Sequence, residues 1–222
     1  MEAIAALVQA VLALDDTLAR FAIDHGRWIY ALLFAVIFAE TGLIVTPFLP
    51  GDSLLFVAGT VVAGAGGALD VHLLVGLLIA AAILGDSVNY AVGRWIGPKV
   101  FERRSRWIRP EYLARTQSFY DRYGAVTIII GRFVPIVRTF APFLAGVASM
   151  HYPRFLAYNV IGAVIWVGVL VYAGFLFGNL PWVKQNLSLI VIGIVVVSLL
   201  PAAVTYVKER RASQAAKVVK VA

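Results

Sequence analysis

Four ionisable residues lie in stretches of this chain that are otherwise apolar. The acidic pair is Glu40 in "ETG" and Asp52 in "PGD", and the basic pair is Arg132 in "GRFVP" and Arg138 in "VRTFAP". Arginine presents a rigid planar fork that binds phosphate or another oxyanion through parallel hydrogen bonds. Carboxylates shielded from water can take up and release protons near neutral pH. These residue types therefore predict an oxyanion site whose occupancy is coupled to protonation.

The composition places this site in a membrane protein. The 222 residues are 61% hydrophobic and 14% charged, with more apolar surface than one small core could hide. The five tryptophans, Trp166 among them, are expected mostly at the membrane interfaces. The chain has no cysteine and three histidines, so we expect no metal, no cofactor and no enzymatic activity.

Positive charge is concentrated in two segments, residues 94–122 and 208–222. Because cytoplasmic loops of membrane proteins carry excess lysine and arginine, we expect both segments, and hence the C-terminus, in the cytoplasm. Neither segment interleaves aromatic residues at base-stacking spacing, so the net charge of +7 does not indicate nucleic-acid binding.

The apolar segments predict an all-α polytopic membrane protein with a single domain. Residues 1–27 are expected to contain an interfacial helix. Continuous transmembrane helices are expected at 72–93, 155–178 and 187–207. Two further apolar segments, 28–64 and 124–149, are interrupted by residues that break helices, namely Pro47, Pro50, Gly51, Pro135 and Pro142.

The basic segments restrict how the interrupted segments can lie in the membrane. If both basic segments are cytoplasmic, the chain must cross the membrane an even number of times between them. Three apolar segments lie between them, however, so one of the three does not cross once. Segment 124–149 is too short for two crossings of about 20 residues each, so we expect a re-entrant hairpin. The same reasoning places the start of 72–93 on the outer side, so segment 28–64, if it is also re-entrant, enters from the opposite face. Two opposed hairpins, each followed by a helix, predict an inverted repeat with its site at mid-membrane.

Three polar residues on the predicted helices are secondary candidates for the same cavity. Asp86 and Asn89 are three residues apart and therefore share one helix face. The alternative for this pair is a packing role, since Gly85 and Gly93 permit close approach of another helix. For Asn159 we favour an interhelical hydrogen bond.

Three motifs in order resemble the DedA family of bacterial inner-membrane proteins, which shares its membrane domain with VTT-domain lipid scramblases. They are "ETGLIVTPFLPGDSLLFVAG", "GDSVNYAVGRWIG" and "GRFVPIVRTFAPFLAG", and the resemblance runs over residues 28–207. The resemblance implies opposed re-entrant hairpins and movement of undecaprenyl phosphate or other phospholipids, dependent on the proton-motive force. It also implies an essential acidic pair, Glu40 and Asp52, and an essential arginine pair, Arg132 and Arg138.

We therefore expect a transporter in which a lipid phosphate pairs with the arginines and protonation of an acid resets the site. One rival is a proton-coupled exporter of small cations or drugs, in which the acids bind the substrate. A second is a non-transporting scaffold that supports envelope homeostasis. The four charged residues could also form ion pairs that only hold two halves of the protein together, although apolar packing is often at least as stable.

Overall fold

The computed structural model describes residues 26–43, 51–102, 126–133, 135–178, 180–186, 189–190 and 193–194. Throughout these ranges the regular secondary structure is helical. Two helices, α4 (Val71–Glu102) and α8 (Tyr152–Phe177), are long and apolar enough to cross a membrane, judged by length and composition. The shorter helices are α2 (Trp28–Gly42), α3 (Gly51–Gly64), α6 (Val126–Gly131), α7 (Pro135–Val147) and α9 (Pro181–Gln185).

Several sequence-based predictions fall outside the described residues. They are the helix within 1–27 except its last two positions, Pro47 and Pro50, most of the loop 94–122, most of the helix 187–207, and the tail 208–222.

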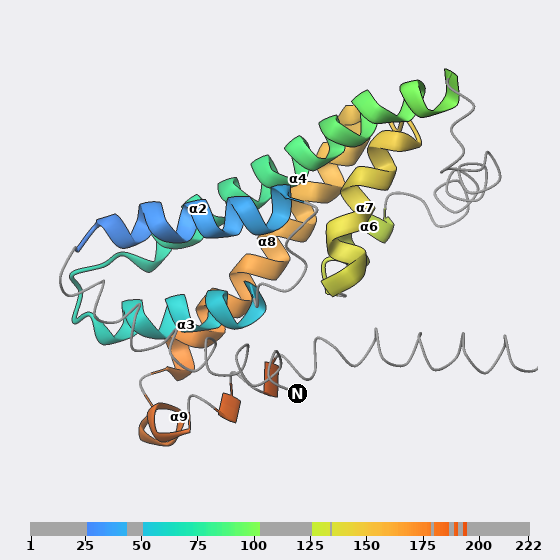
Figure 1. Ribbon diagram of the computed structural model, residues 1–222. Helices are drawn as coiled ribbons and strands as arrows, with labels where there is room; N and C mark the ends of the chain where they lie inside the picture. Colours follow the sequence, from blue (N-terminus) through green and yellow to red (C-terminus); the bar gives the residue numbers. More distant parts are fainter. Residues whose placement is uncertain are drawn as a thin grey trace, which may run out of the picture.

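Helices α4 and α8 form the centre of the structure, and four of the shorter helices lie in two pairs at its two ends (Figure 1). Helices α2 and α3 make up one pair, and α6 and α7 make up the other. Each long helix contacts one member of each pair: α4 packs against α2 and α7, and α8 packs against α3 and α6. The short helices thereby cover part of the middle of both long helices, while side chains such as Leu84 of α4 and Val164 of α8 remain exposed.

Even the three longest of the short helices are too short to cross a membrane on their own. Helices α2, α3 and α7 contain 15, 14 and 13 residues. At 1.5 Å per residue each is about 20 Å long, against a hydrocarbon core of about 30 Å.

The breaks between the short helices follow the sequence only in part. Helix α3 begins at Gly51 and α7 begins at Pro135, where the fixed φ of proline suits a first helical turn. The predicted break at Pro142 is wrong, because α7 continues through this residue. A proline inside a membrane helix is tolerated where neighbouring groups compensate for its missing hydrogen bond.

Helix α4 also extends past residue 93, into the segment predicted as a loop. Gly93 and Gly97 do not end it, because they face α7. A side chain at Gly93 would overlap the Phe143 carbonyl group, and one at Gly97 would come within 3.2 Å of the Val147 backbone. These glycines therefore allow two backbones to pack closely, as small residues do in membrane helices.

Glycines also allow close backbone approach where α4 packs against α2 and where α8 packs against α3. On α4, Gly85 approaches Gly42 of α2 so closely that a Cβ at Gly42 would lie 3.3 Å from the Gly85 Cα. On α8, a Cβ at Gly174 would overlap the Phe56 carbonyl group of α3. Close backbone contact fixes the relative positions of these helices and with them the polar residues that they carry.

Candidate functional site

Seven side chains converge where the two pairs of short helices approach the middle of α4 and α8. The short helices contribute two acids and two arginines, and the long helices contribute an acid, an amide and an indole. We call these residues the central cluster: Glu40, Asp52, Asp86, Arg132, Arg138, Asn159 and Trp166. Six of them are buried, and the side chain of Asp52 is 14% exposed.

Arg138, in the first turn of α7, binds the two acids of the other short pair. Its Nη2 donates to Oε1 of Glu40, near the end of α2, and its Nη1 donates to Oδ1 of Asp52, in the first turn of α3, at 3.0 Å. One guanidinium thus joins three short helices, because a planar fork can satisfy two carboxylates at once.

Glu40 also joins the two helices of its own pair. Its Oε1 accepts a hydrogen bond from the backbone N–H of Gly51 at 3.1 Å. A Cβ at Gly51 would collide with the Glu40 carboxylate. The glycine in "PGD" therefore leaves room for the carboxylate against the backbone, and the bond satisfies one of the free N–H groups at the start of α3.

Arg132 follows the end of α6 and binds the long helices instead. Its Nη2 donates to Oδ2 of Asp86 on α4 and to Oδ1 of Asn159 on α8. Asn159 in turn donates from Nδ2 to the Ile83 carbonyl of α4, at 3.2 Å. Its amide therefore makes the interhelical bond expected from the sequence and also supports an arginine.

The central cluster retains unused hydrogen-bonding capacity. In the described part of the chain, Nε and Nη1 of Arg132 have no partner, and neither do Oε2 of Glu40 and Oδ1 of Asp86. Buried polar groups are nearly always satisfied, so such a concentration of exceptions at one place is informative. The cluster can offer two donors and two acceptors to a further group.

Trp166 lies between the two arginines. The guanidinium carbon of Arg138 is 5.0 Å from the centre of its ring and that of Arg132 is 5.7 Å away, which is within the range of cation–π attraction. Its Nε1 donates to Oδ1 of Asp52 at 2.8 Å. The indole therefore contacts both arginines and one acid.

Sequence reasoning missed this role and placed Trp166 among the interfacial tryptophans. That prediction is wrong for this residue, since it is 1% exposed. The missed signal is helical spacing: Asn159, Gly162 and Trp166 recur three and four residues apart and so share one face of α8. A side chain at Gly162 would come within 3.0 Å of Arg132, so this face is shaped to receive the arginine.

Asn89 lies beside the central cluster but bonds to backbone. Its Nδ2 donates to the Thr139 carbonyl of α7 at 2.8 Å and to the Thr41 carbonyl of α2 at 3.4 Å. These bonds connect α4 to one member of each short pair. The geometry favours the packing alternative for this residue.

The charges of the central cluster do not balance. Three carboxylates, Glu40, Asp52 and Asp86, stand against two guanidinium groups, which leaves one negative charge when all five are ionised. One proton taken up by the acids would neutralise the cluster. Such uptake is favoured because an unbalanced charge in a low-dielectric interior is costly. The arrangement can thus exchange a proton and can offer arginine donors to an anion.

Comparison with known proteins places the cluster within a recognised domain. The VTT domain matches residues 49–176, which include every member of the central cluster except Glu40. Protein DedA of Escherichia coli strain K12 is 50% identical over 214 residues, covering 96% of this chain and 98% of the relative.

Two less similar relatives are membrane proteins by name. An uncharacterized membrane protein of Mycobacterium leprae is 42% identical, covering 75% of this chain and 74% of its own. Inner membrane protein YghB of Escherichia coli strain K12 is 35% identical, covering 71% and 72%. No solved structure matches the chain.

Proposed function

The chain belongs to the DedA family of membrane proteins, and from this premise we propose that it moves the phosphate head of a lipid across the bacterial inner membrane. The substrate is undecaprenyl phosphate or another phospholipid, and the movement is coupled to the proton-motive force. The observation that carries the proposal is the pairing of buried arginines with acids from other helices, beside unused arginine donors.

The proposal includes an inverted repeat of two re-entrant hairpins. Helices α2 and α3 form the first hairpin, and α6 and α7 form the second. The lengths of α2, α3 and α7 support this arrangement, because each is shorter than the hydrocarbon core. The reciprocal contacts support it too: each long helix follows one hairpin in sequence and packs against one member of each. Such repeats place the substrate site at mid-membrane between the halves.

In the proposed step, the phosphate takes the place of the carboxylates at the arginines. Arg138 is held by Glu40 and Asp52, and a protonated acid accepts a hydrogen bond from a guanidinium far less strongly than a carboxylate does. Protonation therefore frees donors of Arg138, while Arg132 contributes its unpartnered Nε and Nη1.

The charge balance of the central cluster determines whether proton uptake favours or opposes phosphate binding. An anionic phosphate entering a cluster that already carries one surplus negative charge is repelled, whereas a cluster that has gained a proton is neutral. Phosphate binding and proton uptake consequently favour each other. Release of the proton on the opposite side restores the carboxylate–arginine pairs and expels the lipid head.

A proton-coupled exporter of cations is the alternative with an observation in its favour. Oε2 of Glu40 and Oδ1 of Asp86 are buried acceptors without a partner among the described residues, and a cationic substrate would satisfy them. In such an exporter the acids bind substrate and the arginines only adjust the acids. Arg138→Lys should then be tolerated better than Glu40→Asp, which is the reverse of the order expected for phosphate transport.

The test is translocation of two tail-labelled lipids in proteoliposomes: undecaprenyl phosphate and the same polyprenol without phosphate. We expect wild-type protein to move only the phosphate form. Arg138→Lys should slow it by at least about tenfold, because an ammonium cannot replace a two-pronged donor. The matched control is Arg154→Lys, at an exposed arginine outside the central cluster. Equal movement of both lipids, or equal effects of both substitutions, would contradict the proposal.

A further inference from the structure

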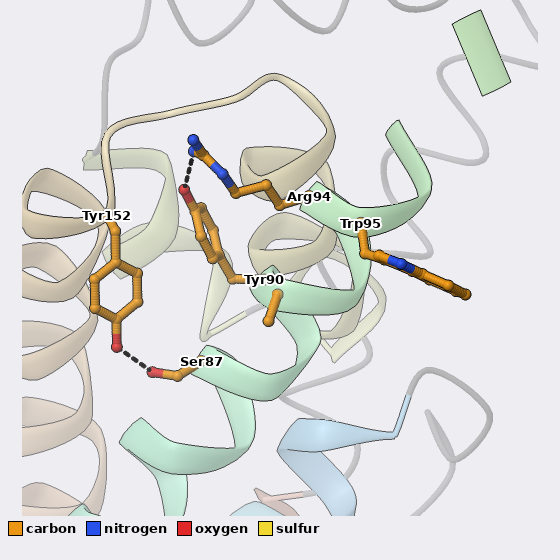
Figure 2. A pocket seen from close by; sticks show the side chains of 6 residues that line it. Ser87, Tyr90, Arg94, Trp95 and Tyr152 are labelled. Carbon is orange, nitrogen blue, oxygen red and sulfur yellow. Dashed lines mark hydrogen bonds between the residues drawn. The ribbon is translucent and has the colours of Figure 1, made fainter. Parts of the chain in front are cut away.

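A second polar site lies away from the central cluster, in a groove between the C-terminal half of α4 and the first turn of α8. The groove has a volume of about 510 Å³. Its lining shares no residue with the central cluster and consists of Ser87, Tyr90, Ala91, Arg94, Trp95 and Tyr152 (Figure 2).

Arg94 supplies the charge of this groove. Its side chain is exposed, and its Nη1 donates to the Tyr90 hydroxyl at 3.1 Å. The same hydroxyl donates to the Met150 carbonyl, so Tyr90 accepts from the arginine and is itself held by the chain before α8. Arg94 is thereby oriented into the groove by a fixed partner.

Unlike Arg132 and Arg138, Arg94 makes no salt bridge with any acid in the described part of the chain. Apart from the bond to Tyr90, no described residue accepts a hydrogen bond from its guanidinium group, so these donors can serve a ligand. The groove is therefore positively charged, and its complement is an anion.

The other groove residues shape the site without competing for the anion. The Tyr152 hydroxyl donates to Oγ of Ser87 at 3.3 Å, and Ser87 donates to the Ile83 carbonyl at 2.7 Å. The rings of Tyr90 and Tyr152 are 5.5 Å apart and form an apolar wall. Arg94 is thus the charged donor for the anion, while the aromatic wall accommodates apolar parts of the same ligand.

The position of the groove along α4 identifies the kind of ligand. The apolar span of α4 runs over Val71–Gly97, so Arg94 lies within one turn of its end. The neighbouring Trp95 is 66% exposed and points to the opposite side of α4 from Tyr152 (Figure 2). Arginine and tryptophan at the end of a span are typical of the headgroup level of a bilayer.

We propose that this groove binds the phosphate headgroup of an anionic membrane lipid through Arg94. The inference goes beyond the proposed transport function and does not rest on it: the groove would hold a lipid at the membrane surface whether or not the central cluster moves one.

Native mass spectrometry of the purified full chain tests the proposal. Phosphatidylglycerol, phosphatidylcholine and soluble glycerol 3-phosphate are titrated separately, and the affinity for the first bound molecule is measured. We expect phosphatidylglycerol to bind tightest, because the choline group neutralises the phosphate of phosphatidylcholine. Arg94→Ala should weaken phosphatidylglycerol binding at least about tenfold, and Arg94→Lys should weaken it less. Arg154→Ala, at an exposed arginine in the first turn of α8 outside the groove, should leave it within about twofold.

Three results would overturn the proposal. Equal losses in Arg94→Ala and Arg154→Ala would mean that interfacial charge attracts lipid without a site. Loss in Arg138→Ala but not in Arg94→Ala would assign the bound lipid to the central cluster. Glycerol 3-phosphate binding as tightly as phosphatidylglycerol would mean that the ligand is a soluble phosphate. Because Arg94 is exposed, its substitution should leave the thermal unfolding of the protein unchanged.

Discussion

Arg138 and Asp52 are 86 residues apart in the sequence, and their Nη1 and Oδ1 atoms are 3.0 Å apart in the structure. Trp166, from a third helix, donates to the same oxygen of Asp52. A buried ion pair of this kind is weak support for stability by itself, since apolar packing often serves as well. Its position where α3, α7 and α8 meet, next to the donors of Arg132 that have no described partner, favours a role in binding.

The indole of Trp166 should matter through both its ring and its N–H. Trp166→Phe keeps an aromatic face for the arginines but removes the hydrogen bond to Asp52. Trp166→Leu removes both. We expect lipid-phosphate translocation to fall modestly in the phenylalanine variant and several-fold more in the leucine variant, consistent with about 0.5–2 kcal/mol for each cation–π contact. Equal rates in the two variants would contradict a cation–π role.

Asp86 and Arg132 should be energetically coupled. Asp86→Asn or Arg132→Gln alone leaves an unpaired buried charge, so each should lower the free energy of unfolding by about 3–5 kcal/mol. The double variant should lose less than the sum by at least about 1 kcal/mol. The measurement is denaturant unfolding in mixed micelles. As a control, Asp86→Asn combined with Gly76→Ala should be additive, and additivity in the Asp86–Arg132 cycle would refute the pairing.

Two glycines of α4 should respond oppositely to alanine. A Cβ at Gly93 would overlap the Phe143 carbonyl of α7, whereas a Cβ at Gly76 meets nothing within 4 Å. Gly93→Ala should therefore lower the free energy of unfolding by about 1–3 kcal/mol or more. Gly76→Ala should raise it by up to about 1 kcal/mol, because alanine favours the helix. Similar melting temperatures for the two variants would show that α4 and α7 are not in close backbone contact.

Asp70 should make stability depend on pH at the start of α4. Its Oδ1 accepts hydrogen bonds from the backbone N–H groups of Leu73, at 3.0 Å, and His72, at 2.7 Å. These bonds favour the carboxylate and lower the pKa of Asp70 below its ordinary value of 3.8, with the Leu73 bond contributing most. A lowered pKa means that the charged form stabilises the fold above pH 3.8 and that this stabilisation is lost as the pH falls through the folded-state pKa.

The measurement is thermal unfolding in detergent over a pH series. Asp70→Ala should melt below wild type at about pH 7, and the gap should narrow as the acid is protonated. Asp70→Asn keeps a side-chain oxygen that can accept the two backbone hydrogen bonds but has no charge. Its melting temperature should be close to that of wild type at about pH 7, and the difference between Asp70→Asn and Asp70→Ala should not narrow toward acid pH. A gap that widens toward acid would contradict the assignment.

Much of the helical architecture could be predicted because apolar length and proline positions are local properties. The long helix at 155–178 and the short helix pairs at 28–64 and 124–149 follow from them. The continuation of α4 past Gly93 could not, because a glycine within a sequence does not reveal whether it ends a helix or faces another backbone. The same limit applies to Pro142, whose tolerance inside α7 depends on tertiary surroundings.

The members of the central cluster were easier to predict than their partners. Charged residues in apolar segments stand out in the sequence, and so Glu40, Asp52 and both arginines are evident. Their pairing is a property of helix packing: Arg138 binds Glu40 and Asp52, while Arg132 binds Asp86 and Asn159. Asp86, which the sequence indicated only as a secondary candidate, is therefore the acid that pairs with Arg132.

In the proposed mechanism, a proton gradient drives a lipid phosphate past Arg138 and its acids. The most direct test is the rate at which labelled undecaprenyl phosphate changes leaflet in proteoliposomes, with and without an imposed pH gradient. The variants are Arg138→Ala and Glu40→Gln, with Arg154→Ala as the control. We predict acceleration by the gradient in wild type and in the control, loss of movement in Arg138→Ala, and loss of the acceleration in Glu40→Gln. Wild-type movement no faster than in empty liposomes, under either condition, would contradict the account.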